Sequence, residues 1–158
     1  MMRRQEREVT DKESIEKILL NCKTCHVAMT DGLSPYVVPL SYGYRFTCDG
    51  ALELFFHSAF EGKKIDILRK NSKVCFEISD EGMFENAESP CNMGYSFSSV
   101  IGYGEVFFLT DAADKCEGLS VIVEHQCGRS VEFTEKQAET VCIYKIVSKD
   151  FNGKQKKG

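Results

Sequence analysis

One stretch decides the fold of this chain: Leu54-Phe55-Phe56-His57-Ser58-Ala59-Phe60-Glu61-Gly62-Lys63-Lys64-Ile65-Asp66-Ile67-Leu68. An apolar and aromatic run, typical of a strand, breaks at His57, and Gly62 then opens a segment with helical spacing. The first backbone N–H groups of a helix have no intrahelical partners and carry a partial positive charge. Lys63 and Lys64 stand in that first turn, where cations are otherwise unfavourable. The stretch therefore predicts an anion site, with a phosphate as the leading candidate.

The size and composition are those of one soluble globular domain. The chain has 158 residues, of which 42% are hydrophobic and 28% charged. We expect a single domain over residues 1–158 whose last part, about 149–158, is a flexible tail, because Lys154-Gln155-Lys156-Lys157 is short, basic and flanked by glycine. The net charge of −4 gives no reason to expect a nucleic-acid partner.

The chain carries no pattern typical of membrane insertion or export. No segment approaches the roughly 20 consecutive apolar residues of a membrane helix. The N-terminal residues 1–8 carry charges of both signs with no apolar run behind them, unlike a signal peptide. We therefore expect a cytoplasmic protein without a membrane partner.

Strand patterns with turn residues between them dominate the chain. Because strands and helices do not alternate regularly, an antiparallel barrel or sandwich with helices packed outside is favoured over a doubly wound sheet. Residues 79–92 are rich in Asp, Glu, Asn and Gly and are expected to form an irregular loop. We expect strands at about 25–29, 35–42, 52–56, 74–78, 95–109 and 140–147, and helices at about 11–21, 62–70 and 111–126, with a helical turn after residue 134.

Proline and glycine mark irregular places within two of these strands. Pro39 has no N–H to donate, so its strand is expected at an edge of the sheet or bulged around that residue. Gly102 and Gly104 interrupt the long strand at 95–109 and indicate a bulge or the close approach of another backbone or a ligand.

The segment Cys22-Lys23-Thr24-Cys25-His26 matches the C-x-x-C-H pattern of covalent haem attachment. A cytosolic setting argues against that cofactor, and no second C-x-x-C completes a zinc site. A redox pair is a further alternative. We favour cysteines that pack as small hydrophobic side chains, and we expect no metal.

His57 and the lysine pair each have two interpretations. His57 lies at the end of a strand beside the expected anion loop, so it either contacts a ligand or substrate or is a rim residue. Lys63 and Lys64 could simply form a solvated helix face. The preceding Ser58 and Gly62 favour phosphate contact.

Three motifs in order resemble a known family. They are Pro35-Tyr36-Val37-Val38-Pro39-Leu40, the stretch from Phe56 to Phe76 built around His57-Ser58-Ala59-x-Glu61-Gly62-Lys63-Lys64, and Ser99-Val100-Ile101-Gly102-x-Gly104. Together they resemble the nitroimidazole-resistance (Nim-type) proteins, a branch of the pyridoxamine-5′-phosphate-oxidase-like flavin-binding split barrels. The resemblance extends from about residue 3 to residue 147.

This resemblance implies a mostly β fold, a six-stranded antiparallel split barrel with about three peripheral helices. It also implies a homodimer with FMN, or alternatively FAD, in grooves at the dimer interface. His57 matches the histidine near the flavin that is implicated in substrate contact, which makes it the candidate catalytic residue. The implied cofactor-binding residues are Val37, Val38, Pro39 and Leu40 along the ring, Ser58, Gly62, Lys63 and Lys64 at the phosphate, and His57 and Ser99 in the groove.

The function that the resemblance implies is a flavin-dependent reductase of small acceptors such as 5-nitroimidazoles. The alternative is a flavin or haem protein that binds, stores or senses without turnover. True pyridoxamine phosphate oxidases have a further C-terminal substrate-binding segment, and the present sequence ends without one, which disfavours vitamin B6 oxidation. No nicotinamide fingerprint identifies the electron donor.

Overall fold

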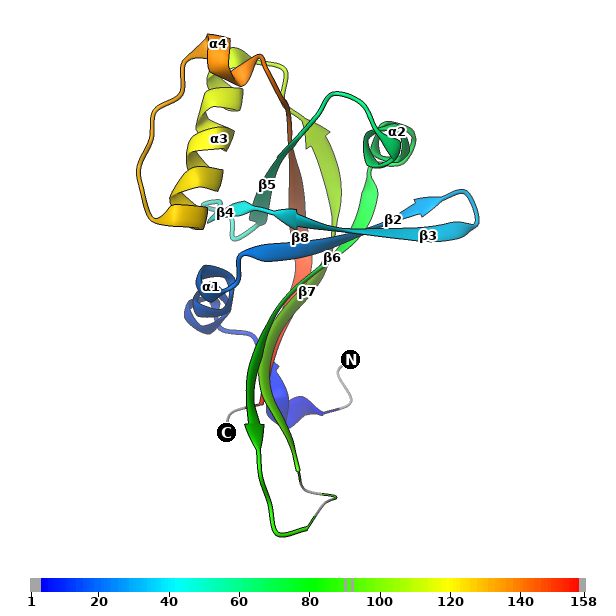
Figure 1. Ribbon diagram of the computed structural model, residues 1–158, viewed down its shortest axis with the longest axis vertical. Helices are drawn as coiled ribbons and strands as arrows, with labels where there is room; N and C mark the ends of the chain where they lie inside the picture. Colours follow the sequence, from blue (N-terminus) through cyan, green and yellow to red (C-terminus); the bar gives the residue numbers. More distant parts are fainter. Residues whose placement is uncertain (1–3, 90, 92, 157–158) are drawn as a thin grey trace.

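The computed structural model describes residues 4–89, 91 and 93–156, which form a curled antiparallel sheet with helices around it (Figure 1). The helices are α1 (Lys12–Asn21), α2 (Lys63–Lys70), α3 (Ala112–Cys127) and α4 (Glu135–Ala138), with a 3-10 turn at Gln5–Arg7. The strands are β1 (Glu8–Val9), β2 (Thr24–Asp31), β3 (Ser34–Ser41), β4 (Gly43–Phe46), β5 (Leu52–Ser58), β6 (Lys73–Glu85), β7 (Gly94–Phe108) and β8 (Cys142–Lys156).

The chain itself brings the two ends of the sheet together, although the described strands at these ends do not pair with each other. Its strand order is β3-β2-β6-β7-β8-β5-β4, with β1 added to β8, and every pairing is antiparallel. The two end strands, β3 and β4, are separated by one residue, Tyr42, so the edges of the sheet must meet there. The fully buried Tyr42 donates its hydroxyl proton within the core, 2.8 Å from the Leu19 carbonyl and 3.2 Å from the Cys22 carbonyl. The expected split barrel with outer helices is confirmed.

The described residues form eight strands instead of the six expected. The two additional strands, β1 and β4, are two and four residues long. Such short segments carry too little alternation to be recognised in the sequence. Their pairing with β8 and β5 defines them.

Two predictions of irregular structure are wrong. Within 79–92, β6 continues as far as Glu85 against β7, and the two strands form a hairpin that projects from the barrel (Figure 1). The tail expected at about 149–158 is part of β8 as far as Lys156, and residues 157–158 lie outside the described residues. Within it, Gly153 pairs with both Val9 and Val100. Pairing with two neighbouring strands orders these polar residues, and the local composition does not reveal it.

Several local predictions are confirmed. The helix expected at about 11–21 is α1, and Asp11 caps it by accepting a hydrogen bond from Ser14 N at 2.9 Å. The register of β7 against β8 shifts at Gly104, where a side chain would collide with the Val147 carbonyl. Within the described residues, no helix is long and apolar enough to cross a membrane.

Candidate functional site

The start of α2 is an uncapped helix N-terminus. Gly62 is the N-cap, and no side chain caps the helix there. The first helical bond runs from Asp66 N to the Gly62 carbonyl at 3.1 Å, which leaves the preceding N–H groups without intrahelical partners. Gly62 has φ +131°, a conformation that favours glycine, and nothing lies within 4 Å of a Cβ placed on it. An N-terminus without a side-chain cap is the kind of backbone arrangement that can bind an anion.

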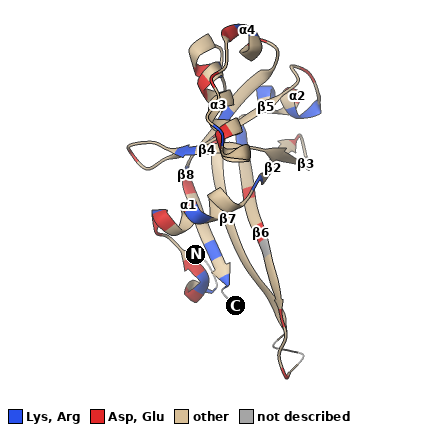
Figure 2. Ribbon diagram, turned by 60° about the vertical axis from the view of Figure 1, so that its left-hand side comes forward, with Lys and Arg blue, Asp and Glu red and all other residues tan. Residues whose placement is uncertain are grey.

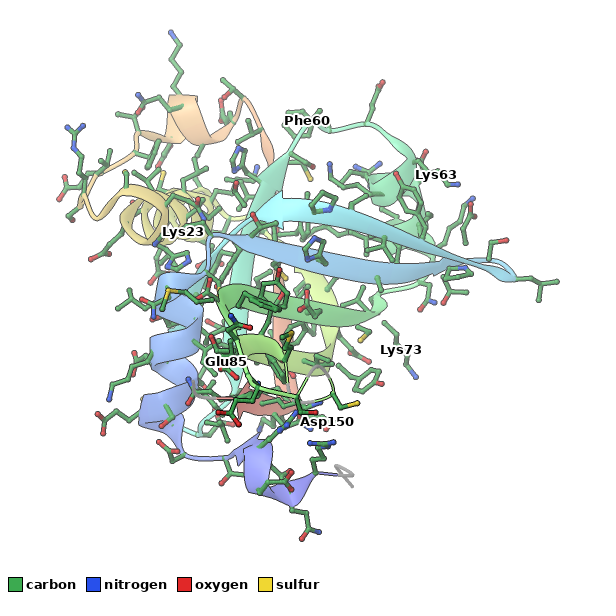
Figure 3. The ribbon with its side chains drawn as sticks, turned by 60° about the horizontal axis from the view of Figure 1, so that its bottom comes forward. Lys23, Phe60, Lys63, Lys73, Glu85 and Asp150 are labelled. Carbon is green, nitrogen blue, oxygen red and sulfur yellow. The ribbon has the colours of Figure 1, made fainter. Side chains whose placement is uncertain are left out.

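Lys63, in the first turn of α2, lies beside the hairpin of β2 and β3. Basic residues occupy both ends of α2 (Figure 2). Lys63 Nζ is 3.1 Å from the Asp31 carboxylate and 4.7 Å from the centre of the Tyr36 ring (Figure 3). Lys63 is exposed and Lys64 is half-buried. The fold thus brings the predicted anion loop next to the edge strand that carries Pro39.

His57 and Ser58 end β5, just before the loop that leads to α2. Strand alternation directs the exposed His57 outward and the buried Ser58 inward. Ser58 Oγ donates to the carbonyl of Ala59 at 2.8 Å.

The predicted ring-facing strand is β3, which pairs with β2 on one side and forms one end of the sheet order. This confirms the edge position predicted from Pro39. Along it, Val37 and Pro39 are exposed, whereas Val38 and Leu40 pack against the core. Of the four predicted residues, two therefore have exposed side chains and two have side chains turned towards the core.

The structure does not place Ser99 beside the lysines within one chain. Ser99 lies on β7, where it pairs with Ser79 of β6 on one side and with Lys154 of β8 on the other. Strand register puts it on the same face of the sheet as Pro39, but three strands from β3, which is about 14 Å at the usual strand spacing.

The chain also matches a known family. The model of the family described as pyridoxamine 5′-phosphate oxidase matches residues 11–155. The chain belongs to the pyridoxamine 5′-phosphate oxidase family. This confirms the resemblance drawn from the three motifs. No curated protein matches the chain.

Solved structures share this fold. The chain is similar to a candidate 5-nitroimidazole antibiotic resistance protein from Bacteroides thetaiotaomicron, with 30% identity, 94% of this chain and 86% of that chain covered, and a TM-score of 0.79. It shares the fold of the flavocytochrome Anf3 from Azotobacter vinelandii, at 20% identity and a TM-score of 0.81. That match covers 100% of this chain and 73% of the flavocytochrome chain. It also shares the fold of an FAD- and haem-binding protein from Mycobacterium smegmatis, at 14% identity and a TM-score of 0.80. That match covers 96% of this chain and 74% of that protein's chain.

This member of the oxidase family exposes an apolar band that the sequence analysis missed. Val37, Ala28, Cys75 and Tyr103 stand in one cross-strand row, and Ile101 follows in the next row on the same face. Val37, Ile101 and Tyr103 are 53%, 44% and 61% exposed. We call these five residues the outer band. Alternating apolar residues occur on buried and exposed strand faces alike, so the sequence could not separate them.

The C-x-x-C-H segment is a packing element in this family member. Cys22 and Cys25 are buried free thiols, and burial raises the pKa of Cys22 to about 11. His26 lies on the outer face of the sheet, with Nδ1 3.0 Å from the Glu77 carboxylate. Across the described ranges, no cluster of His, Cys, Asp or Glu could hold a metal ion. The expectation of packing cysteines is confirmed.

Proposed function

We propose that this protein binds FMN, with FAD as the alternative, and uses it to reduce small nitroaromatic acceptors. The observation that carries the proposal is the uncapped start of α2, with Lys63 and Lys64 in its first turn and Lys63 against Tyr36 of the edge strand β3. Membership of the pyridoxamine 5′-phosphate oxidase family supports a flavin as the bound phosphate compound. The similar proteins described as a flavocytochrome and as FAD-binding support it further.

The residues present fit a flavin phosphate. The free N–H groups at the start of α2 would donate to phosphate oxygens, and Lys63 would exchange the Asp31 carboxylate for the phosphate. Val37, Pro39 and the free backbone edge of β3 would lie against the ring. When bound, the flavin supplies the electron transfer, and the chain positions it.

His57 is the proposed substrate-facing residue. It is exposed at the end of β5, five residues before Gly62. Its imidazole would orient the nitro group of an acceptor or donate a proton to it.

A homodimer completes this proposal. A second copy packed on the outer band would cover Val37, Ile101 and Tyr103 and close the side of the groove that is open in one chain. Because Ser99 shares that face, it would reach the groove from the second copy.

The phosphate assignment is tested by titrating FMN and riboflavin into Lys63→Ala/Lys64→Ala and into Lys70→Ala, and following the quenching of flavin fluorescence. Lys70 is the matched control, because it is an exposed lysine at the other end of the same helix. Two partly solvated charge-assisted contacts at about 1 kcal/mol each predict roughly thirtyfold weaker FMN binding in the double variant. Riboflavin, which lacks the phosphate, should bind all three proteins equally. Equal FMN affinity in the double variant and the wild type would contradict the assignment.

Turnover is tested separately. Reduced, flavin-loaded protein should transfer electrons to a 5-nitroimidazole faster than free reduced flavin does. His57→Ala should slow the transfer when it is compared with wild type carrying the same amount of bound FMN. If loaded protein is no faster than free flavin, the chain is a carrier or sensor and not a reductase.

A further inference from the structure

The seam of the barrel, where β3 and β4 meet at Tyr42, is held by side chains and not by strand pairing. β3 and β4 are the two ends of the sheet order, and within the described residues they do not pair with each other. The buried Tyr42 donates its hydroxyl to the Leu19 carbonyl at 2.8 Å and to the Cys22 carbonyl at 3.2 Å. Both carbonyls belong to the end of α1, so the seam is attached to that helix.

The end of α3 fastens the seam from the other side. Gln126 Nε2 donates to the Tyr42 carbonyl at 2.8 Å and to the Lys23 carbonyl at 3.0 Å. His125 Nε2 lies 2.9 Å from the Cys22 carbonyl oxygen. Lys23 Nζ in turn donates to the His125 carbonyl at 2.6 Å. We call the residues of this hydrogen-bonded set the seam clamp: Leu19, Cys22, Lys23, Tyr42, His125 and Gln126.

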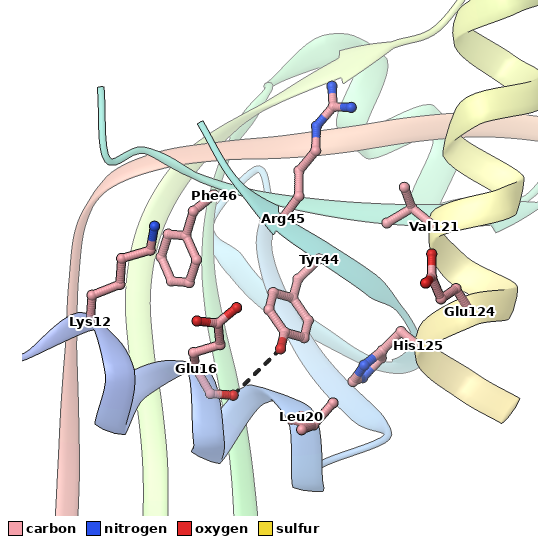
Figure 4. Close-up of a pocket in the computed structure, with 9 residues that line it drawn as sticks. All are labelled: Lys12, Glu16, Leu20, Tyr44, Arg45, Phe46, Val121, Glu124 and His125. Carbon is pink, nitrogen blue, oxygen red and sulfur yellow. Dashed lines mark hydrogen bonds between the residues drawn. The ribbon is translucent and has the colours of Figure 1, made fainter. Parts of the chain in front are cut away.

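His125 is the clamp donor whose ordinary pKa lies near neutral pH. Its side chain extends from α3 towards Tyr44 (Figure 4), and the residue is only 7% exposed. A carbonyl oxygen only accepts, so Nε2 carries a hydrogen and donates to Cys22. Protonation would add a second hydrogen on Nδ1, which is buried and has no partner among the described residues. A buried donor without an acceptor costs free energy, so the clamp fits the neutral imidazole.

The groups packed on the imidazole also disfavour its protonation. Burial, and after it the Lys23 charge, lowers the pKa of His125, although the hydrogen bond to the Cys22 carbonyl acts in the opposite direction. The Tyr42 and Tyr44 rings lie with their centres 4.6 and 5.1 Å from that of the imidazole, and burial raises the pKa of both hydroxyls. Burial likewise raises the pKa of the Cys22 thiol to about 11. None of these three groups therefore supplies a negative charge near neutral pH.

The remaining charges that face His125 lie in a pocket between α1, β4 and α3 (Figure 4). Glu16 of α1 and Glu124 of α3 line it, and both are exposed, so water and salt screen their attraction for an imidazolium. Lys12 of α1 and Arg45 of β4 bring two cations to the same wall. Two anions and two cations oppose each other there, so the burial of His125 decides its charge.

We propose that the seam clamp is a pH-sensitive latch. While His125 is neutral, the clamp holds the end of α3 against Tyr42 and the junction of α1 and β2. When His125 takes up a proton, the end of α3 detaches and the seam opens. Because β3 ends beside Tyr42, opening also frees that end of β3. The latch acts on the seam itself, so it does not depend on whether the chain binds flavin.

The open state binds a proton more readily than the closed state, because His125 regains its ordinary pKa of about 6.5 in water. The latch is therefore fully closed above that pH, and opening becomes more favourable as the pH falls towards the lower pKa of the closed state. Between about pH 7.5 and about pH 5.5, an open state with the ordinary pKa raises the opening equilibrium by up to about tenfold.

The test is hydrogen exchange of the full chain, followed by mass spectrometry at these two pH values and corrected for the intrinsic exchange rate. The increase in opening should appear in residues 119–127 and 40–46, which carry the end of α3 and the seam. It should be absent from the pairing of β5 with β8. No increase at the seam, or an equal increase between β5 and β8, would overturn the proposal, because the second result indicates unfolding of the whole chain.

Two histidine variants make the test specific. A glutamine in His125→Gln can keep a donor on the Cys22 carbonyl but takes up no proton, so the corrected exchange of its seam should not change with pH. His57→Gln is the matched control, because it removes an exposed histidine at the end of β5 and should keep the response. A pH response that persists in His125→Gln would contradict the latch.

An NMR titration of the wild type decides the question even if His125→Gln loosens the seam at both pH values. At about pH 6 an ordinary histidine is mostly protonated. In the closed protein, His125 should still carry a hydrogen on Nε2 alone. A His125 that titrates at the ordinary pKa while the seam stays closed would refute the latch.

Discussion

The buried carboxylate of Glu53 should make a measurable contribution to stability. Glu53 lies on β5 with its side chain 7% exposed, and it accepts from Lys145 Nζ at 2.5 Å and Arg45 Nε at 2.6 Å. Replacing it with Gln keeps the volume but removes the charge that compensates both cations. We therefore expect Glu53→Gln to lower the free energy of unfolding.

The magnitude follows from how much water the two cations retain. Removing one partner of a fully buried ion pair costs about 3–5 kcal/mol. Lys145 and Arg45 remain 23% and 38% exposed, and Arg45 keeps its second partner Glu117, so part of their hydration is recovered. We expect a loss of about 2 kcal/mol, which lowers Tm by roughly 4–8 °C for a chain of this size.

The measurement is urea unfolding of the wild type, Glu53→Gln and Glu117→Gln over a range of pH. Glu117 is 54% exposed and serves as the control, with an expected change below about 0.5 kcal/mol. Burial raises the pKa of Glu53, but hydrogen bonds from Lys145 and Arg45 outweigh this and hold it below its ordinary value. The stabilisation is therefore complete above the unfolded pKa of about 4.3 and is lost as the pH falls through the lower folded pKa. A Glu53→Gln variant within 0.5 kcal/mol (about the control's change) of the wild type at neutral pH would refute this reasoning.

Three further substitutions test the core, the helix start and the barrel closure. Tyr144→Phe should be neutral or stabilising by up to about 1 kcal/mol in urea unfolding, because the buried Tyr144 hydroxyl has no partner among the described residues. Gly62→Ala should destabilise by about 1 kcal/mol in thermal unfolding, because φ is +131° there, and an unchanged Tm would contradict that backbone conformation. Tyr42→Phe should cost about 1–2 kcal/mol, since the carbonyl of Leu19 loses its buried side-chain donor, whereas the carbonyl of Cys22 keeps His125 Nε2. A cost no larger than that of Tyr144→Phe would show that the Tyr42 hydrogen bonds contribute nothing.

The helix starts and the central strands could be predicted because their causes are local. Asp11 is a good N-cap residue wherever it precedes an amphipathic segment, and Gly62 marks a helix start through its own backbone freedom. Pro39 indicated an edge strand because a residue without an N–H cannot donate to a second neighbour.

The rest depended on partners distant in the sequence. Gly153 and the lysines around it resemble a frayed tail until β1 and β7 are seen on either side of them. The position of Ser99, three strands from β3, follows from sheet order, which no local pattern encodes. The sequence places His125 near the end of an expected helix, and only the structure shows that its side chain is buried, with Nε2 2.9 Å from the Cys22 carbonyl.

The single residue between β3 and β4 restricts how this chain can vary in length. An insertion beside Tyr42 would reverse the alternation of β4 and turn Tyr44 and Phe46, which pack against the core, towards solvent. The turns at Gly32 and Gly50 have no such constraint, because nothing lies within 4 Å of either glycine's Cβ position. Homologous chains should therefore gain and lose residues at those two turns and keep a fixed length across Tyr42.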